Sequence, residues 1–478
     1  MDTPTDARPA PSPWATFAVC AAGVYLTTLD LSIVNVAFPD ILTDFGISRV
    51  DASWIVTVYN IFYGSLLVVA GKAADALGRR RLFRVGIVLF ALGSLVAAVA
   101  PDLTVLVVGR AIQGIGGAIL APASLGLLVA AFPLERRTQV VAMWGGVGAL
   151  GVASGPSLGA LLIALADWRA AFWINLPIVA VLLAVTGSTL VESPRAALAN
   201  RPDYPGAGIV TLGLASVALG LSRSEVWGLT DLRTIGAVVV GLLVGALFVD
   251  RQRRHPEPIL DLTLFESRPF SVANVSGLAF FGGFAALGLN NVLFLRQAWG
   301  YDVLTAGLLS ALAPLTVALL APFTGRVAAA RGFRPLVVGG PLLVGAMMIV
   351  FDLVFDATRR PLTFVLLGEL VAVGIAAFIP VNAAAAVADL PPKRLSVGGA
   401  VNNTFRQIGS VFGVATLVAV LGSATSVDEL VVAHGRGWLL IAGAMGVAAL
   451  IGLAQPSRVD PSRATAATAA GPPADHSA

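Results

Sequence analysis

Long apolar blocks recur along this 478-residue sequence, and they constrain its fold more than any other feature. Each block holds about 20 residues, the length that an α-helix needs to cross the hydrocarbon core of a bilayer. Only 12% of the residues are charged, whereas an ordinary soluble domain carries about 25%. The sequence therefore predicts an all-α integral membrane protein with fourteen spans, near 15–37, 53–71, 82–100, 104–130, 139–164, 169–191, 206–221, 234–250, 270–295, 304–324, 335–355, 362–387, 399–421 and 437–454.

Basic residues are unevenly distributed between the polar segments that join these blocks. If the N-terminus lies in the cytoplasm, most of the 31 Lys and Arg residues fall in cytoplasmic segments, as is typical of membrane proteins. The sequence therefore predicts a multi-pass protein of the plasma (inner) membrane with both termini in the cytoplasm. An anionic lipid bilayer explains the net charge of +4, so no nucleic-acid partner is expected.

The sequence lacks the residues that most enzyme chemistries need. Cys20 is the only cysteine, and of the three histidines, His255 and His434 are expected in loops on opposite sides of the membrane. No cluster is therefore expected to hold a catalytic metal. Lys72 follows a glycine, but Ala73 stands where a phosphate-binding loop requires Ser or Thr. We expect no enzyme activity and no cofactor, and any uphill movement would take its energy from an ion gradient or a partner subunit.

The segment between the second and third blocks, "GKAADALGRRR", combines glycines, one acid and a run of arginines. The arginines are sufficient to hold this loop in the cytoplasm. The glycines permit sharp turns at helix ends, and the acid can accept hydrogen bonds from an arginine or from a helix N-terminus opposite it. Such a clasp can form in one conformation and break in another, so we expect a cytoplasmic gate made by Gly71, Asp75, Gly78, Arg79 and Arg80.

Three charged residues lie within the apolar blocks at a similar depth. At about 1.5 Å per residue, Asp30, Arg110 and Glu369 each sit roughly 10 Å below the outer surface. A charge in hydrocarbon is costly, so each marks a candidate site. Plainer interpretations exist: Asp30 as a packing anchor with Asn35, Arg110 as a fixed link between helices, and Glu369 as a side chain that reaches outward to the interface.

Other polar side chains in the blocks are candidates for contact with a transported molecule. Arg406 either lines an inner cavity or extends its side chain to the inner surface. Three asparagines are candidate polar contacts at the same cavity, namely Asn290, Asn291 and Asn402.

Five motifs in order resemble those of the major facilitator superfamily. "GKAADALGRRR" resembles its motif A, and "GRVAAARGFR" is a weaker copy in the second half of the chain. "LVVGRAIQGIGGA" is similar to its span 4 motif. "LDLSIVNVAFPDI" and "NNTFRQIGSVFGVA" resemble segments of the fourteen-span drug:proton antiporters. "GVGALGVASGPSLGALL" resembles the antiporter motif of span 5, with Gly151, Gly155, Pro156 and Gly159 in register.

The resemblance implies a major facilitator fold, with two six-helix halves and an extra central pair of helices. An N-terminal half at 15–191 and a C-terminal half at 270–454 would flank a linker at 192–269 that holds the extra pair. Disordered cytoplasmic tails are expected at 1–14 and 455–478. The extra spans are expected to have a packing or lipid-facing role, and the family implies a monomer.

The resemblance also implies a function: proton-coupled antiport that exports amphipathic or cationic small molecules by alternating access. Spans 1, 4, 9 and 12 would surround the cavity, so Asp30, Arg110 and Glu369 are expected to face one aqueous chamber. Asp30 and Arg110 would be partners there, and Glu369 would take up the proton. The glycines of span 5 would either allow close packing or block leak. Two alternatives are an exporter specific for one metabolite or amino acid, and a non-transporting membrane sensor or scaffold.

Overall fold

The computed structural model describes residues 12–192, 203–228, 230–256, 258–390, 395–422, 424 and 426–456. Within these residues the chain is helical, with no strand, and 14 helices are long and apolar enough to cross a membrane. The expected tails fall almost wholly outside the described part of the chain. The protein is therefore an all-α, multi-pass membrane protein, as the apolar blocks predict.

The first six spans form one half of the molecule. The sixth is interrupted by a short break, so two helices make it. These helices are α1 (Pro13–Phe45), α2 (Arg49–Leu77), α3 (Arg79–Ala98), α4 (Leu103–Ala131), α5 (Leu134–Leu165), α6 (Ala170–Trp173) and α7 (Asn175–Thr189).

The last six spans form the other half, and two further helices come between the halves. The intervening pair is α8 (Tyr204–Trp227) and α9 (Leu232–Arg254), followed by the short 3₁₀ helix η1 (Leu262–Glu266). The second half contains α10 (Arg268–Leu293) with its π-helical extension η2 (Phe294–Ala298), α11 (Val303–Arg331), α12 (Arg334–Val354), α13 (Pro361–Val387), α14 (Leu395–Leu421) and α15 (Val427–Gly452).

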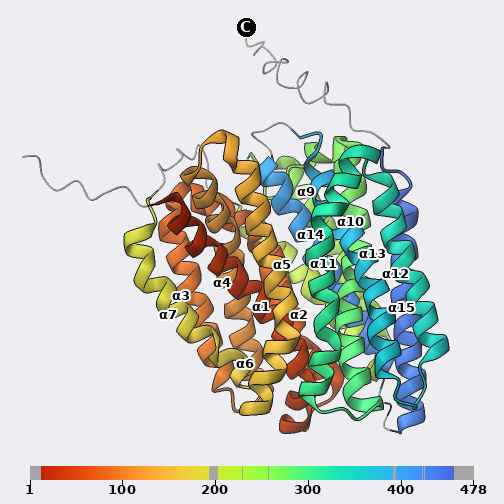
Figure 1. The fold of residues 1–478 in the computed structure, drawn as a ribbon. Coiled ribbons are helices and arrows are strands. Elements are labelled where there is room, and N and C mark those ends of the chain that lie inside the picture. The colour runs from red at the N-terminus through yellow and green to blue at the C-terminus, as the bar shows by residue number, and fades with distance from the viewer. Residues whose placement is uncertain are drawn as a thin grey trace, which may run out of the picture.

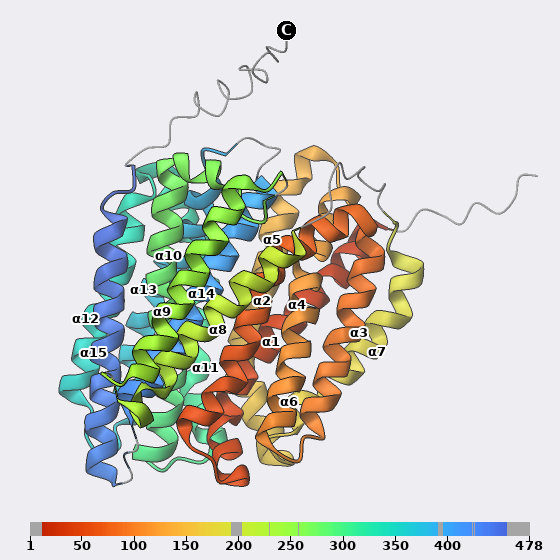
Figure 2. The ribbon, with the colours of Figure 1, turned by 180° about the vertical axis from the view of Figure 1, so that it is seen from behind.

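The two halves stand side by side and meet along two seams (Figure 1). One seam joins α2 to α14, and the other joins α5 to α11. The additional helix α8 packs against both α2 and α14, and Figure 2 shows it crossing that face of the molecule. We call the side on which α1 begins and α15 ends the tail side, and the opposite side the far side.

A buried aspartate fixes the tail-side end of the α8–α9 pair. Asp203 accepts hydrogen bonds from Arg251 at 2.7 Å, from Gln252 at 3.0 Å and from the Gly206 backbone N–H at 2.9 Å. Burial raises the pKa of the Asp203 carboxyl, but these hydrogen bonds outweigh burial and hold the pKa below its ordinary value. The pair is thus joined by a satisfied carboxylate as well as by apolar packing.

Two details differ from the sequence expectations. The prediction that His434 lies in a loop is wrong. The helix α15 begins ten residues before the expected span, so it includes His434, whose side chain is 1% exposed. Gly71 lies inside α2, where its Cα faces Pro122 of α4, so it makes no turn. Gly78 does make the turn, with φ of 105°, between α2 and α3.

Two arginines tie the halves together on the far side. Arg296 donates to both carboxylate oxygens of Asp40 on α1, at 2.8 and 3.0 Å. Arg49, at the start of α2, donates to the Gly422 carbonyl at 2.8 Å and to Gln297 Oε1 at 2.8 Å. We call these contacts the far-side latch. Because each bond joins one half to the other, the latch holds the far side closed.

On the tail side, by contrast, α5 and α11 separate. Near the far side, a Cβ added at Gly307 of α11 would lie 2.7 Å from the Pro156 carbonyl of α5. Toward the tail side, a Cβ added at Gly146 of α5 or at Gly325 of α11 would meet no atom within 4 Å. The two helices diverge toward the top of Figure 1. The halves therefore touch at the far side of this seam and part at the tail side.

Removing the latch should open the far side. We expect Arg296→Gln to lengthen the distance between spin labels at Pro101→Cys and Ala357→Cys, which lie in exposed far-side turns of opposite halves. The labels require only Cys20→Ser as background, since Cys20 is the single cysteine. Double electron–electron resonance measures the distance.

The matched control exchanges the charges in Asp40→Arg/Arg296→Asp, which keeps the ion pair and should restore the shorter distance. An unchanged distance in Arg296→Gln would show that the ion pair does not hold the far side closed.

Candidate functional site

A completely buried ion pair lies in the first half. Asp30 of α1 and Arg110 of α4 are both 0% exposed, and the guanidinium contacts the carboxylate directly. Arg110 also donates to Gln113 Oε1 at 2.8 Å and to the Ile55 carbonyl of α2 at 3.0 Å. Asn175 of α7 donates to the second oxygen of Asp30 at 3.0 Å. The pair thus has hydrogen-bond partners on both sides.

Neutral polar side chains extend this pair into a network. Gln113 donates to Asp30 at 3.0 Å and to Ser94 of α3 at 2.7 Å. The Tyr59 ring of α2 lies 4.4 Å from the guanidinium carbon of Arg110, at cation–π distance. The network therefore joins α1, α2, α3, α4 and α7, and its charges are compensated where water has no access.

The structure does not bring the three intramembrane charges into one chamber. Asp30 and Arg110 are partners, but neither is exposed, so they line no aqueous space. Glu369 lies in the other half on α13, where it is half-buried and accepts a hydrogen bond from Thr316 of α11. The expectation of one shared chamber is therefore wrong. The sequence indicated a depth for each residue but not its direction around the helix axis, so it could not separate Glu369 from the other two.

The asparagines that the sequence suggests as substrate contacts do not lie together at one site. Asn35 is partly exposed, and its amide nitrogen is 3.9 Å from a Cβ added at Gly288 of α10, so it faces the other half. Asn290 bonds the His434 ring nitrogen Nδ1 at 2.8 Å. Two further bonds link helices of the second half: Trp438 donates to Asn291 at 3.0 Å, and Asn402 donates to Asn274 at 3.2 Å.

The acid of the expected gate, Asp75, lies in the last turn of α2 and not in a loop, and it pairs within its own half, with the first turn of α3. Arg79 donates to Asp75 at 2.8 Å and to the Gly126 carbonyl of α4 at 2.9 Å. Arg80 donates to the Gly187 carbonyl of α7 at 2.8 Å. The Asp75 side chain remains 48% exposed, so the junction between α2 and α3 forms no closed clasp to the second half in this conformation.

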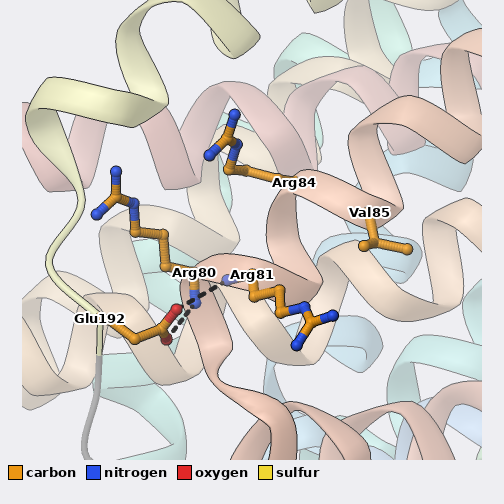
Figure 3. Close-up of a pocket in the computed structure, with 5 residues that line it drawn as sticks. All are labelled: Arg80, Arg81, Arg84, Val85 and Glu192. Carbon is orange, nitrogen blue, oxygen red and sulfur yellow. Dashed lines mark hydrogen bonds between the residues drawn. The ribbon is translucent and has the colours of Figure 1, made fainter.

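The sequence analysis missed a partner of this junction. Glu192, which follows α7, accepts hydrogen bonds from the backbone N–H groups of Arg80 and Arg81 at 3.0 and 3.1 Å (Figure 3). A carboxylate at a helix N-terminus is favourable, because the first N–H groups of a helix lack partners. Arg84 and Val85 line the same pocket. An acid directly after the sixth span was the available sequence signal.

The glycines of the antiporter motif pack α5 onto α1. A Cβ added at Gly151 would overlap Thr28 and lie 2.8 Å from the Tyr25 carbonyl, and one at Gly155 would overlap Ser32. A Cβ at Gly159 would lie 3.3 Å from Ile33. Close approach of these two helices therefore depends on the absence of side chains.

Pro156 leaves the Val152 carbonyl, four residues earlier, without its helical partner. Ser32 of α1 donates to that carbonyl at 2.9 Å. The same arrangement occurs in the second half, where Thr324 of α11 donates at 3.0 Å to the carbonyl that Pro380 leaves free in α13. Neighbouring hydroxyl groups thus satisfy the carbonyl oxygens that these prolines expose.

A polar stripe on α14 is the candidate site for a transported molecule. Its members recur at helical spacing, and each is partly or fully exposed although other helices surround α14. We call this set the interior stripe, and it consists of Gly399, Asn403, Arg406 and Ser410.

Contacts on either side of the interior stripe locate it. Asn402 faces α10, and Thr404 donates to the Gly64 carbonyl of α2 at 3.1 Å. Val411, on the opposite face of α14, packs with Leu214 of α8. At 100° per residue, the stripe therefore points between α10 and α2, away from α8 and toward the space between the halves.

Arg406 is the charged member of the interior stripe. Its guanidinium carbon lies 4.1 Å from the centre of the Phe281 ring on α10. Tyr63 of α2 lies close enough to interact with it electrostatically. Among the described residues, no carboxylate forms an ion pair with Arg406, and its buried Nε has no hydrogen-bond partner.

The family model of the major facilitator superfamily matches residues 20–250 and 273–475. The chain belongs to the major facilitator superfamily. It is a transporter, not an enzyme, and the motif resemblance is confirmed across both halves.

Relatives and solved structures agree with this assignment. The chain is 30% identical to the multidrug resistance protein Stp of Mycobacterium tuberculosis, over 85% of this chain and 76% of that protein. It is 32% identical to the tetracenomycin C resistance and export protein of Streptomyces glaucescens, over 86% and 76%. An autoinhibited POT family peptide transporter shares the fold with a TM-score of 0.69 at 18% identity, over 93% and 98% of the two chains.

Breaking the buried ion pair should be costly. Arg110→Met leaves the Asp30 carboxylate buried without a counter-charge, and we expect a loss of about 3–5 kcal/mol in the free energy of unfolding. Asp30→Asn in the same chain should recover part of that loss. Thermal unfolding in detergent of both single variants and the double variant measures the coupling.

The exposed pair of Asp250 and Arg254 on α9 provides the control, and Arg254→Met should change the unfolding temperature little. Additive effects of Asp30→Asn and Arg110→Met would show that the pair is not coupled.

The α1–α5 contact predicts a second effect of mutation. Gly151→Ala places a methyl group against Thr28 and the Tyr25 backbone, so we expect it to cost about 1–3 kcal/mol and to reduce transport. Gly146→Ala on the same helix is the matched control, because its methyl group enters open space. Equal unfolding temperatures for the two variants would contradict close packing as the role of Gly151.

Proposed function

We propose that this protein is a proton-coupled antiporter that exports amphipathic small molecules by alternating access. The observation that carries the proposal is the interior stripe, which presents polar groups and a charge between two halves that the far-side latch joins. A related protein is named for multidrug resistance and another for antibiotic resistance and export, which supports efflux as the direction.

The tail side is assigned to the cytoplasm in this proposal. More than half of the described Lys and Arg residues lie toward the tail-side ends of the helices, which is the usual arrangement for the cytoplasmic side of a plasma membrane. The conformation described is then open to the cytoplasm and closed to the outside. The chain is proposed to act as a monomer, with one substrate path between its two halves.

The junction between α2 and α3 is proposed as the cytoplasmic gate. In the open conformation Asp75 is exposed, and the described part of the chain pairs it with Arg79. Closure of the tail side would bring the end of α2 toward the start of α14, whose helix N-terminus would attract the Asp75 carboxylate. Arg80 and Glu192 would keep the junction fixed to α7 during that movement.

Glu369 is proposed to carry the proton. It is a half-buried carboxyl within a span, it has a hydroxyl partner in Thr316, and no arginine neutralises it among the described residues. We do not assign this role to Asp30, because Arg110 compensates its charge and neither side chain is exposed to solvent. Protonation and deprotonation of Glu369 would bias the α11–α13 contact and so couple the proton to the movement of the halves.

The test uses everted membrane vesicles that contain the full chain. Wild type should release protons when a transported dye is added. If the Glu369 carboxyl is required, the rate of this proton release should fall about tenfold or more in Glu369→Gln. Glu266→Gln is the matched control, since Glu266 is exposed outside the spans. Dye transport with normal proton movement in Glu369→Gln would reject Glu369 as the carrier.

A panel of unrelated dyes separates the alternatives. Transport of several dyes supports broad efflux, whereas transport of a single metabolite class would indicate the specific exporter. A folded protein that binds dye but moves nothing would favour a sensor or scaffold over the proposed function.

A further inference from the structure

We propose that Arg406 makes the interior stripe an anion-recognition subsite, so that the transported molecule carries an acidic group beside an aromatic or apolar body. The proposal rests on the proposed function, because the occupant of the stripe is taken to be the transported molecule. Carboxylate, sulfonate and phosphate groups share the chemistry that a guanidinium recognises.

The charges of the interior lead to this assignment. Arg110 and Asp30 compensate each other in direct contact, and both are fully buried. Glu369 bonds Thr316 between α11 and α13, on helices other than those around Arg406. Arg406 therefore remains as a positive charge between the halves without an acidic partner among the described residues. A charge within a membrane span is costly unless something pairs with it, and an acidic substrate would supply the missing partner.

The surroundings of Arg406 suit an anion with a planar body. The guanidinium carbon of Arg406 lies over the Phe281 ring, 4.1 Å from its centre, and Phe284 on the same helix is partly exposed. A guanidinium placed in this way still presents its edge N–H groups, which bind carboxylates in a bidentate manner. The adjacent aromatic rings can stack on the apolar part of the molecule.

The neighbouring polar groups extend the subsite along α14. Asn403 and Ser410 lie one turn away on either side of Arg406, and Ser410 donates to the Arg406 carbonyl at 3.0 Å. The Asn403 amide provides both donors and an acceptor, so it can bind a second polar group of the substrate. The subsite thus combines a fixed charge with an adaptable neighbour, a combination that allows several acids to bind.

This inference revises the substrate class expected from the sequence. A lipophilic cation at the interior stripe would meet the like charge of Arg406, which disfavours its binding. The sequence expectation of cationic substrates relied on acids in the cavity, but Asp30 is buried against Arg110, and Glu369 bonds Thr316 away from the interior stripe.

The test compares two dyes that differ only at one acid. Rhodamine B carries a free carboxylate, and in rhodamine B ethyl ester that group is blocked. We expect the purified full chain to bind rhodamine B about tenfold more tightly than the ester, as measured by fluorescence anisotropy. Arg406→Gln should weaken the binding of rhodamine B but not that of the ester, and so abolish the preference between them. Arg406→Lys should retain part of this preference.

Arg326→Gln is the matched control, because Arg326 also lies near a phenylalanine ring, at 5.7 Å from Phe323, but on an exposed face of α11. Its preference should equal that of wild type. The proposal is overturned if wild type binds the two dyes equally, binds neither, or if Arg406→Gln keeps the preference. If the binding preference depends on Arg406 but vesicles show no uphill transport of dye, the result would support the anion subsite and reject efflux as the function.

Discussion

The contact between Asp30 and Arg110 is the interaction on which the first half depends. Neither group is exposed, and the surrounding amide and hydroxyl side chains come from α3, α4 and α7. Removing one charge would leave the other buried without compensation, which is far costlier than keeping both. The first half is therefore held together as one body by this network.

The seams use a different chemistry. The far side closes through bonds from Arg296 and Arg49, whose groups are only partly buried, so water can replace the bonds when the contact opens. Within each half, hydroxyl groups of a neighbouring helix donate to the carbonyl oxygens that Pro156 and Pro380 leave without a helical partner. The far-side contacts between the halves thus differ from the fully buried Asp30–Arg110 pair inside the first half, because water can replace them.

Hydropathy was sufficient to predict the spans, and depth was sufficient to suggest Asp30 and Arg110 as partners. The orientation of side chains around each helix was not predictable, because uniformly apolar helices give little indication of which face is buried. Glu369 was therefore placed in the wrong surroundings, and Asn175 was missed as a partner of Asp30. His434 was taken for a loop residue because the first turns of α15 are more polar than its centre.

The position of α8 has a consequence for how molecules reach the interior stripe. This helix covers the seam between α2 and α14, whereas no described helix packs across both α5 and α11. In the proposed transport cycle, molecules dissolved in the lipid of the tail-side leaflet would enter beside α5 and α11, the seam that α8 does not cover. Such a route favours compounds that concentrate in the bilayer, since the membrane delivers them to the protein without passage through water.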